Sequence, residues 1–229
     1  MAGQRIDYTR QAALGLTVPP AIAVVGAGGV GSWTALFAAL SGVPEIWLFD
    51  HDTVSDHNLN RLPVPPDAVG MYKSDAVAKT IALYRPDCRV LALRKFSAVL
   101  ADNLSLADRI PWIIATTDTH ASRQEVHQWA WATGRVRYLE AAAEGDTGSA
   151  TGEPAQFATP EETQPGYISV PAWTGPCVFA ANVAIAHVLH NQPMNDRAIR
   201  LGFTRETERF EVYDSELTER RPNERRNAA

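Results

Sequence analysis

A short apolar run that ends in a cluster of glycines, AIAVVGAGGVG at residues 21–31, constrains this chain more than any other feature. A continuous apolar stretch of this length is typical of a strand that is buried on both faces. In the turn, Gly26 permits a sharp change of direction, Gly28 lets the backbone approach a phosphate or sugar, and Gly31 allows a helix to pack closely on the strand. The run predicts a strand, a turn and a helix that together bind a nucleotide.

A second apolar strand, EIWLFDHD, ends in carboxylates, and its Asp50 stands 19 residues after Gly31. An acid at this place in a dinucleotide-binding fold accepts hydrogen bonds from ribose hydroxyls. The same pattern fits a nicotinamide dehydrogenase and an ATP-using enzyme, so it predicts a nucleotide site and leaves the chemistry open.

Strand and helix signals continue to alternate along the chain. Apolar runs at 88–93, 111–118 and 137–143 predict three more strands. Helical patterns precede the first of them at 74–85 and the last at 122–134. Such alternation predicts the α/β class, with a Rossmann-like, doubly wound and mostly parallel sheet whose ligands bind beyond the carboxyl ends of its strands.

The later part of the chain is less regular. Extended segments at 152–160 and 166–173, an apolar helix at 174–191 and a hairpin at 200–214 predict that antiparallel strands extend the sheet. No composition shift marks a linker. We expect a single domain over residues 1–214, a nucleotide site mainly within 21–123, and a charged, flexible tail at 215–229.

Charge and cysteine usage limit the classes of partner. The formal charge of −5 argues against a nucleic-acid backbone as the main partner. No run of about 18 apolar residues and no apolar leader occurs, so we expect a cytoplasmic location and no membrane association. Cys88 and Cys177 are far apart in the sequence and no CxxC pair exists. This usage predicts that both cysteines are buried for packing, and it predicts neither a disulfide framework nor a zinc site. Arginines gather near the end of the sequence at Arg205, Arg209, Arg220, Arg221, Arg225 and Arg226.

The segment that begins at Asp50, DHDTVSDHNLNRLPVPPDAVGMYKSDAVAK, resembles the ThiF/MoeB family of adenylyltransferases within the ubiquitin-activating-enzyme superfamily. Five features of that family occur here in order: the glycine turn, D-x-D-x-V, N-L-x-R, V-G-x-x-K, and an aspartate in a T-D context after a later strand. The resemblance covers roughly residues 6–190. It implies a short member of the family without structural zinc.

The resemblance implies a role for each matching residue. Asp50 would bind ribose, Asn58, Arg61 and Lys73 would engage the ATP phosphates, and Asp118 would coordinate Mg2+. Arg10 would reach the triphosphate of the partner subunit in a homodimer, and Arg123 would hold the Asp118 loop. A triphosphate carries about four negative charges, which must be neutralised while its α-phosphorus is attacked. A cluster of basic side chains with Mg2+ can provide this neutralisation. The implied catalytic set is Arg10, Arg61, Lys73 and Asp118, and the implied nucleotide-binding set is Gly26, Gly28, Gly29, Gly31, Asp50, Asp52, Asn58, Arg61, Lys73 and Asp118.

The implied reaction is ATP-dependent adenylation of the C-terminal carboxylate of a small ubiquitin-like or sulfur-carrier protein ending in Gly-Gly, with release of pyrophosphate. Residues 144–172 contain no cysteine, which favours adenylation without thioester formation, although Cys177 and Cys88 stay open as thioester sites. Three alternatives remain. A tRNA threonylcarbamoyladenosine dehydratase shares the GGVGSW turn, so tRNA is not excluded; the others are a non-catalytic nucleotide-binding scaffold subunit and a nicotinamide oxidoreductase.

Overall fold

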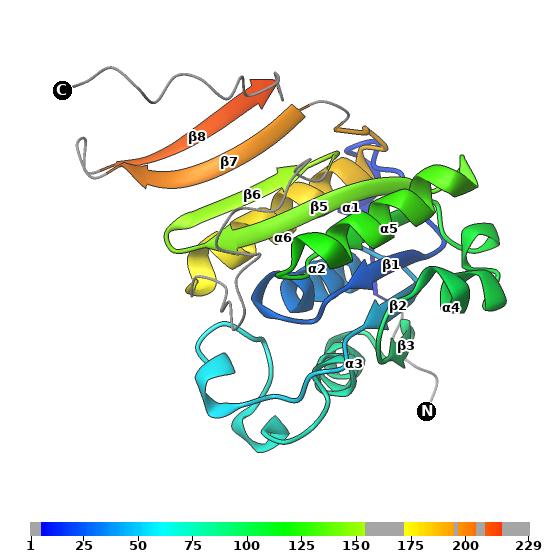
Figure 1. Cartoon of the computed structure of the whole chain (residues 1–229), viewed down its shortest axis with the longest axis horizontal. Coiled ribbons are helices and arrows are strands. Elements are labelled where there is room, and N and C mark those ends of the chain that lie inside the picture. Colours follow the sequence, from blue (N-terminus) through cyan, green and yellow to red (C-terminus); the bar gives the residue numbers. More distant parts are fainter. Residues whose placement is uncertain (1–5, 154–171, 195–196, 205–208, 217–229) are drawn as a thin grey trace.

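The computed structural model describes residues 6–153, 172–194, 197–204 and 209–216, and in this part of the chain eight strands form one sheet (Figure 1). The strand order is β3-β2-β1-β4-β5-β6-β7-β8. The first five strands in this order are parallel and the last three are antiparallel. The strands are β1 Ile22–Val25, β2 Glu45–Phe49, β3 Arg89–Leu93, β4 Trp112–Ala115, β5 Arg137–Glu144, β6 Thr147–Thr151, β7 Arg197–Thr204 and β8 Arg209–Glu216.

Helices cover both faces of the parallel part of the sheet. Alternate residues of β1 face opposite ways: Ile22 and Val24 pack in a core with α2, α3 and α6, whereas Ala23 and Val25 pack in a second core with α4 and α5. This two-sided burial explains why the strand reads as a continuous apolar run. The helices are α1 Thr9–Ala12, α2 Gly29–Leu40, α3 Lys73–Tyr84, α4 Ala98–Asn103, α5 His120–Thr133 and α6 Thr174–Leu189.

The connections after β1 and β4 leave toward opposite faces of the sheet. From β1 the chain enters α2 on one face, and from β4 it enters α5 on the other. These strands are neighbours, so a crevice opens between their carboxyl ends, which is where open α/β sheets bind ligands.

The expected α/β class and the mostly parallel, antiparallel-extended sheet are confirmed. The expected terminal hairpin is present as β7 and β8, and β8 continues through Glu216, two residues past the expected end of the domain at residue 214. Strand β6 was not predicted from the sequence, because TGSAT consists of small and polar residues without a strong apolar alternation. The expected extended segments fall largely within 154–171, outside the described residues, as do Arg205, Arg220, Arg221, Arg225 and Arg226.

A buried arginine ties the N-terminal segment to the sheet. Arg85, which directly follows α3, is 2% exposed. Its guanidinium donates to the hydroxyl of Tyr8 and the carbonyl of Ala39, and it forms an ion pair with Asp87 at 2.8 Å. Arg85 therefore joins α1, α2 and α3 at the edge of the sheet opposite the crevice.

We expect Arg85→Ala to lower the free energy of unfolding by about 2 kcal/mol, because it leaves buried acceptors without their donor. Urea denaturation measures this change. The matched control is Arg89→Ala, whose side chain is 68% exposed and pairs with Glu45, and which should stay within about 0.5 kcal/mol of the parent protein. Equal effects of the two changes would contradict the structural role of Arg85.

Candidate functional site

The glycine turn lies at the crevice and joins β1 to α2. The amide of Gly26 donates to the carbonyl of Phe49 at 2.7 Å, and its φ of +100° is in the region that favours glycine. A Cβ on Gly31 would lie 1.9 Å from the Gly26 carbonyl oxygen. Gly28 and Gly29 border the cavity described below, where the free amides at the start of α2 favour an anion.

Asp50 is fixed beside this turn at the end of β2. Its two carboxylate oxygens accept from the backbone amides of Ala27 at 2.6 Å and Asp52 at 2.8 Å. Burial raises the pKa of the Asp50 carboxyl, although both of these amide hydrogen bonds act in the opposite direction. The carboxylate thus braces the glycine turn and keeps lone pairs available for a hydroxyl donor.

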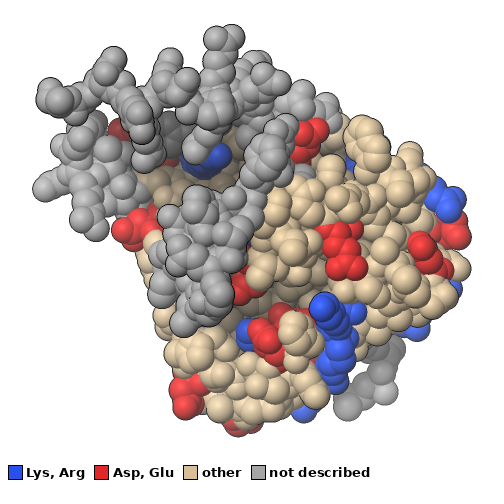
Figure 2. Space-filling view, in the orientation of Figure 1, with Lys and Arg blue, Asp and Glu red and all other residues tan. Residues whose placement is uncertain are grey.

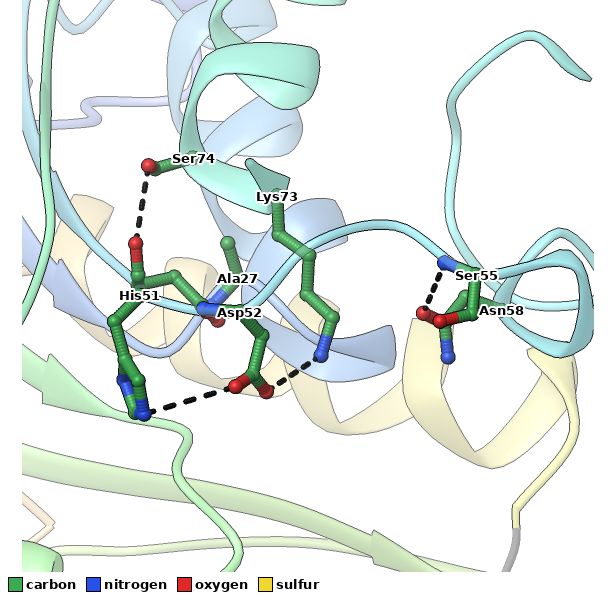
Figure 3. A network of polar contacts seen from close by, with 8 residues as sticks. Ala27, His51, Asp52, Ser55, Asn58, Lys73 and Ser74 are labelled. Atoms are coloured by element: carbon green, nitrogen blue, oxygen red, sulfur yellow. Dashed lines mark hydrogen bonds and ion pairs between the residues drawn. The ribbon is translucent and has the colours of Figure 1, made fainter. Parts of the chain in front are cut away.

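Lys73 stands at the first position of α3 and points toward Asp52 (Figure 3). Its ammonium lies 2.8 Å from Asp52 Oδ2. The Lys73 hydrogen bond lowers the pKa of the Asp52 carboxyl. Asp52 is 56% exposed on its side chain, so this pair is weakly held and Lys73 can exchange one anionic partner for another.

Asn58 and Arg61 come from the loop between β2 and α3. Asn58 is buried, and its Oδ1 accepts from the amide of Ser55 at 3.0 Å, which stabilises the turn η1 Asp56–Asn58 (Figure 3). Arg61 donates to the carbonyl of His57 at 2.9 Å and to Asn60 Oδ1 at 3.0 Å. Asn58 thus shapes the loop that carries the Arg61 guanidinium.

Asp118 follows β4 and is exposed. The Arg123 Nε donates to the carbonyl of Thr117 at 2.8 Å, and Arg123 Nη1 lies 3.2 Å from Glu140 Oε1. The expectation that Arg123 holds the Asp118 loop is confirmed by this contact with the preceding residue. Thr119 caps α5 by accepting from the amide of Ser122 at 3.4 Å, so Asp118 itself is not the helix cap.

These elements enclose a cavity of about 1260 Å³ at the carboxyl ends of the parallel strands, and Figure 2 shows acidic and basic side chains close together around the hollow on this face. Most of the expected set lines the cavity: Gly26, Gly28, Gly29, Asp50, Asp52, Asn58, Arg61, Lys73 and Asp118. Gly31 lies beneath the turn, where it packs against Gly26 and Thr116.

Arg10 does not join this cavity. It is exposed on α1, and its neighbour Gln11 donates from Nε2 to the carbonyl of Ser41 at 2.6 Å. Ser41 follows the C-terminal end of α2, about 18 Å from the end that borders the cavity at 1.5 Å per residue. Within one chain, Arg10 and the cavity therefore lie at opposite ends of the parallel strands.

Several lining residues were not singled out from the sequence. Arg94 and Lys95 follow β3 directly, and the rule that ligands bind beyond strand ends could have found them. Glu140 on β5 and Arg200 on β7 also line the cavity. Their place depends on how β5, β6 and β7 pair, which no local sequence signal specifies.

Both thiols are buried, as expected. Cys177 is 2% exposed and lies against Gly29 and Arg61, and Cys88 is 8% exposed. Burial raises the pKa of each thiol to about 11. The thiolate is the reactive form of cysteine, and a raised pKa leaves little thiolate at neutral pH. Neither cysteine is therefore activated as a nucleophile.

We expect neither Cys88 nor Cys177 to react appreciably with iodoacetamide in the native protein at neutral pH. Both should be alkylated after unfolding in guanidinium, since unfolding restores an ordinary thiol pKa and access. Intact-mass spectrometry distinguishes the two conditions. Rapid native labelling of Cys177 would reopen the possibility that it forms a thioester.

The geometry defines an α/β protein with a cavity at the switch point of its sheet, where open α/β sheets bind ligands. A family model described as the ThiF family matches residues 16–168, which is more than half of the chain. The chain belongs to the ThiF family.

Curated relatives share one segment with the chain. Ubiquitin-like modifier-activating enzyme 5 of Drosophila virilis is 44% identical over 70 residues, which cover 31% of this chain and 18% of the fly protein. The protein of the same name from Arabidopsis thaliana is 47% identical over 66 residues, covering 29% of this chain and 15% of the plant protein. The matches thus span less than a fifth of the length of these two relatives.

Solved structures share the fold. PaaA matches with a TM-score of 0.67 and 22% identity, covering 86% of this chain and 64% of PaaA. A crystal structure of E. coli MccB with ATP matches with a TM-score of 0.69 and 16% identity over 86% of this chain and 64% of MccB. Among the described residues, no helix has the length and apolar character needed to cross a bilayer.

Proposed function

We propose that this chain is an ATP-dependent adenylyltransferase that activates the C-terminal carboxylate of a small ubiquitin-like or sulfur-carrier protein ending in Gly-Gly. The observation that carries this proposal is the gathering of the glycine turn, Arg61, Lys73 and Asp118 around one cavity. Membership in the ThiF family and the likeness to MccB with ATP support ATP as the nucleotide. The name of the curated relatives supports a ubiquitin-like partner.

In this proposal the chain's residues bind and orient the two reactants. The start of α2 receives phosphate oxygens, Asp50 accepts from ribose hydroxyls, and Lys73 transfers from Asp52 to the triphosphate. The substrate carboxylate forms a bond to the α-phosphorus while the bond to the bridging oxygen of the β-phosphate breaks. That oxygen takes the electron pair, and pyrophosphate leaves.

Asp118 fits the proposed role in holding Mg2+. Its exposed carboxylate lines the cavity, and a hard oxygen donor next to phosphate oxygens is the kind of site that Mg2+ prefers. When bound there, the ion would neutralise charge that develops on the phosphates. One ligand atom from each of Asp50, His51 and Asp52 also lies within 4.8 Å of the other two, but in this group Asp50 already accepts from two backbone amides and Asp52 pairs with Lys73.

ATP–pyrophosphate exchange in the presence of Gly-Gly-ended carriers tests the proposal. Asp118→Ala should abolish the exchange, whereas Asp67→Ala, which removes an exposed acid outside the cavity, should leave it unchanged. If the Asp118→Ala variant kept the exchange activity, the proposed adenylyltransferase assignment would be wrong. ATP turnover stimulated by modified tRNA and suppressed by salt would instead favour the dehydratase alternative, and nucleotide binding without turnover would favour a scaffold subunit.

We further propose that Arg10 acts across the boundary of a homodimer. Arg10 is too far from the cavity of its own chain to contact a triphosphate there, so it would contact the triphosphate bound by the other subunit. Mixing the inactive variants Arg10→Ala and Asp118→Ala should restore part of the exchange, since a hybrid dimer retains one site with both residues. Absence of rescue in dimers shown to be mixed would contradict this arrangement.

A further inference from the structure

The cavity continues beyond the proposed phosphate site onto the antiparallel part of the sheet. Strand register places Ala142 on β5, Ser149 on β6 and Arg200 on β7 in one row across the sheet. All three line the same cavity as Asp118. The row therefore forms a path from the end of β4 toward Arg200.

Among the described residues, the face of the sheet that carries this row is only partly covered. Ala141 and Ala150 point to the opposite face, where they pack in the core with α6, so Ala142 and Ser149 face away from α6. Helix α5 packs on β4 and β5, and in the described part of the chain no helix covers β6 or β7 on that side (Figure 1). Because the side chains of Ala142 and Ser149 are small, the described residues leave a shallow trough along this row that ends at Arg200.

Arg200 lines the end of this trough. Its side chain is partly exposed, and no hydrogen bond or ion pair engages its guanidinium among the residues that the structure describes. Glu144 lines the same cavity from β5, but no ion pair joins it to Arg200. Arg123, by comparison, is neutralised by Glu140. Arg200 is thus available to a carboxylate brought by a ligand.

The distance along the trough matches a short stretch of extended peptide. From β4, which Asp118 follows, to β7 is three strand spacings, or about 14 Å at 4.8 Å each. An extended chain advances about 3.4 Å per residue, so about four residues cover that distance. A peptide whose carboxylate lies at the reacting phosphate would place its fourth residue from the end near Arg200.

We propose that Arg200 binds an acidic side chain located three to five residues before the C-terminal carboxylate of the protein substrate, and so determines which carriers are adenylated. This inference rests on the proposed adenylation. In this proposal, the antiparallel part of the sheet recognises the C-terminal segment of the protein substrate.

Peptides that end in Gly-Gly and carry Glu, Gln or Lys four residues before the carboxyl end provide the test, with pyrophosphate exchange as the readout. The parent protein should use the Glu peptide with a kcat/KM about tenfold above that of the Lys peptide. Arg200→Glu should reverse this order, and Arg200→Lys should keep it in weakened form. Lys79→Glu makes the same change of net charge on an exposed face of α3 and should preserve the order of the parent protein.

The outcomes separate the two proposals. Exchange with all three peptides at equal kcat/KM, or an unchanged order in Arg200→Glu, would overturn the role of Arg200 and leave adenylation standing. Exchange with none of these peptides and with no Gly-Gly-ended carrier would overturn both.

Discussion

Replacing Lys73 with alanine is expected to lower the kcat of ATP–pyrophosphate exchange by two to three orders of magnitude, about the effect of removing one group that stabilises transition-state charge. The ammonium lies 2.8 Å from Asp52 in a pair that is open to solvent on the Asp52 side. Pairs of this kind contribute about 1 kcal/mol or less to stability. The loss of activity should therefore come without a comparable loss of stability.

Two further substitutions locate the effect at Lys73 itself. Lys79→Ala removes an ammonium from the exposed face of the same helix and should leave exchange unchanged. Lys73→Arg keeps the charge but replaces a compact ammonium by a planar fork, so it should recover part of the activity. If Lys73→Ala retained exchange within about threefold of the parent value, a role for Lys73 at the phosphates would be untenable.

Asp52→Asn separates the two partners of Lys73. Under the proposed function, the lysine leaves Asp52 before it binds a phosphate, and Asp52→Asn removes the ionic partner that holds it. The exposure of Asp52 keeps this exchange of partners energetically small. In the proposed function, Asp52 would hold Lys73 in place while the site is empty, and Lys73 would contact the nucleotide.

The sequence predicted those parts of the molecule that follow from local patterns. Asp50, Lys73 and Asp118 each stand just after a strand or at the start of a helix, and parallel strands bring all such positions to one edge of the sheet. Topology alone therefore gathers residues that are far apart along the chain. The apolar runs were sufficient to predict a mostly parallel, doubly wound sheet.

The remaining parts of the site depend on pairing between distant segments. Strand β6 becomes a strand by hydrogen bonding to both β5 and β7, since its residues have little intrinsic preference for one. The place of Arg200 in the cavity follows from this pairing. The burial of Arg85 likewise depends on Tyr8 and Ala39, which lie far from it in sequence. Local periodicity carries no information on such contacts.

Gly31→Ala is expected to lower the free energy of unfolding by about 3 kcal/mol, at the upper end of the usual cost of overpacking. The new Cβ would stand 1.9 Å from the Gly26 carbonyl oxygen and 2.4 Å from Thr116 Oγ1. The first obstacle is backbone and cannot rotate away, and Thr116 Oγ1 is held by its hydrogen bonds to the carbonyls of Val25 and Gly26. The turn would have to open, whether or not a nucleotide is present.

Gly28→Ala provides the contrasting case within the same turn. A Cβ at Gly28 meets no atom within 4 Å, so denaturation without ligand should match the parent protein. The methyl group would nevertheless border the cavity where the phosphates are proposed to bind, and ATP affinity measured by calorimetry should fall roughly tenfold. Unchanged affinity would mean that no nucleotide approaches Gly28, and equal instability of both variants would mean that packing alone explains the glycines. If Gly31→Ala loses stability and Gly28→Ala loses ATP affinity, the two results together would show that this segment both forms a tight turn and contacts a ligand.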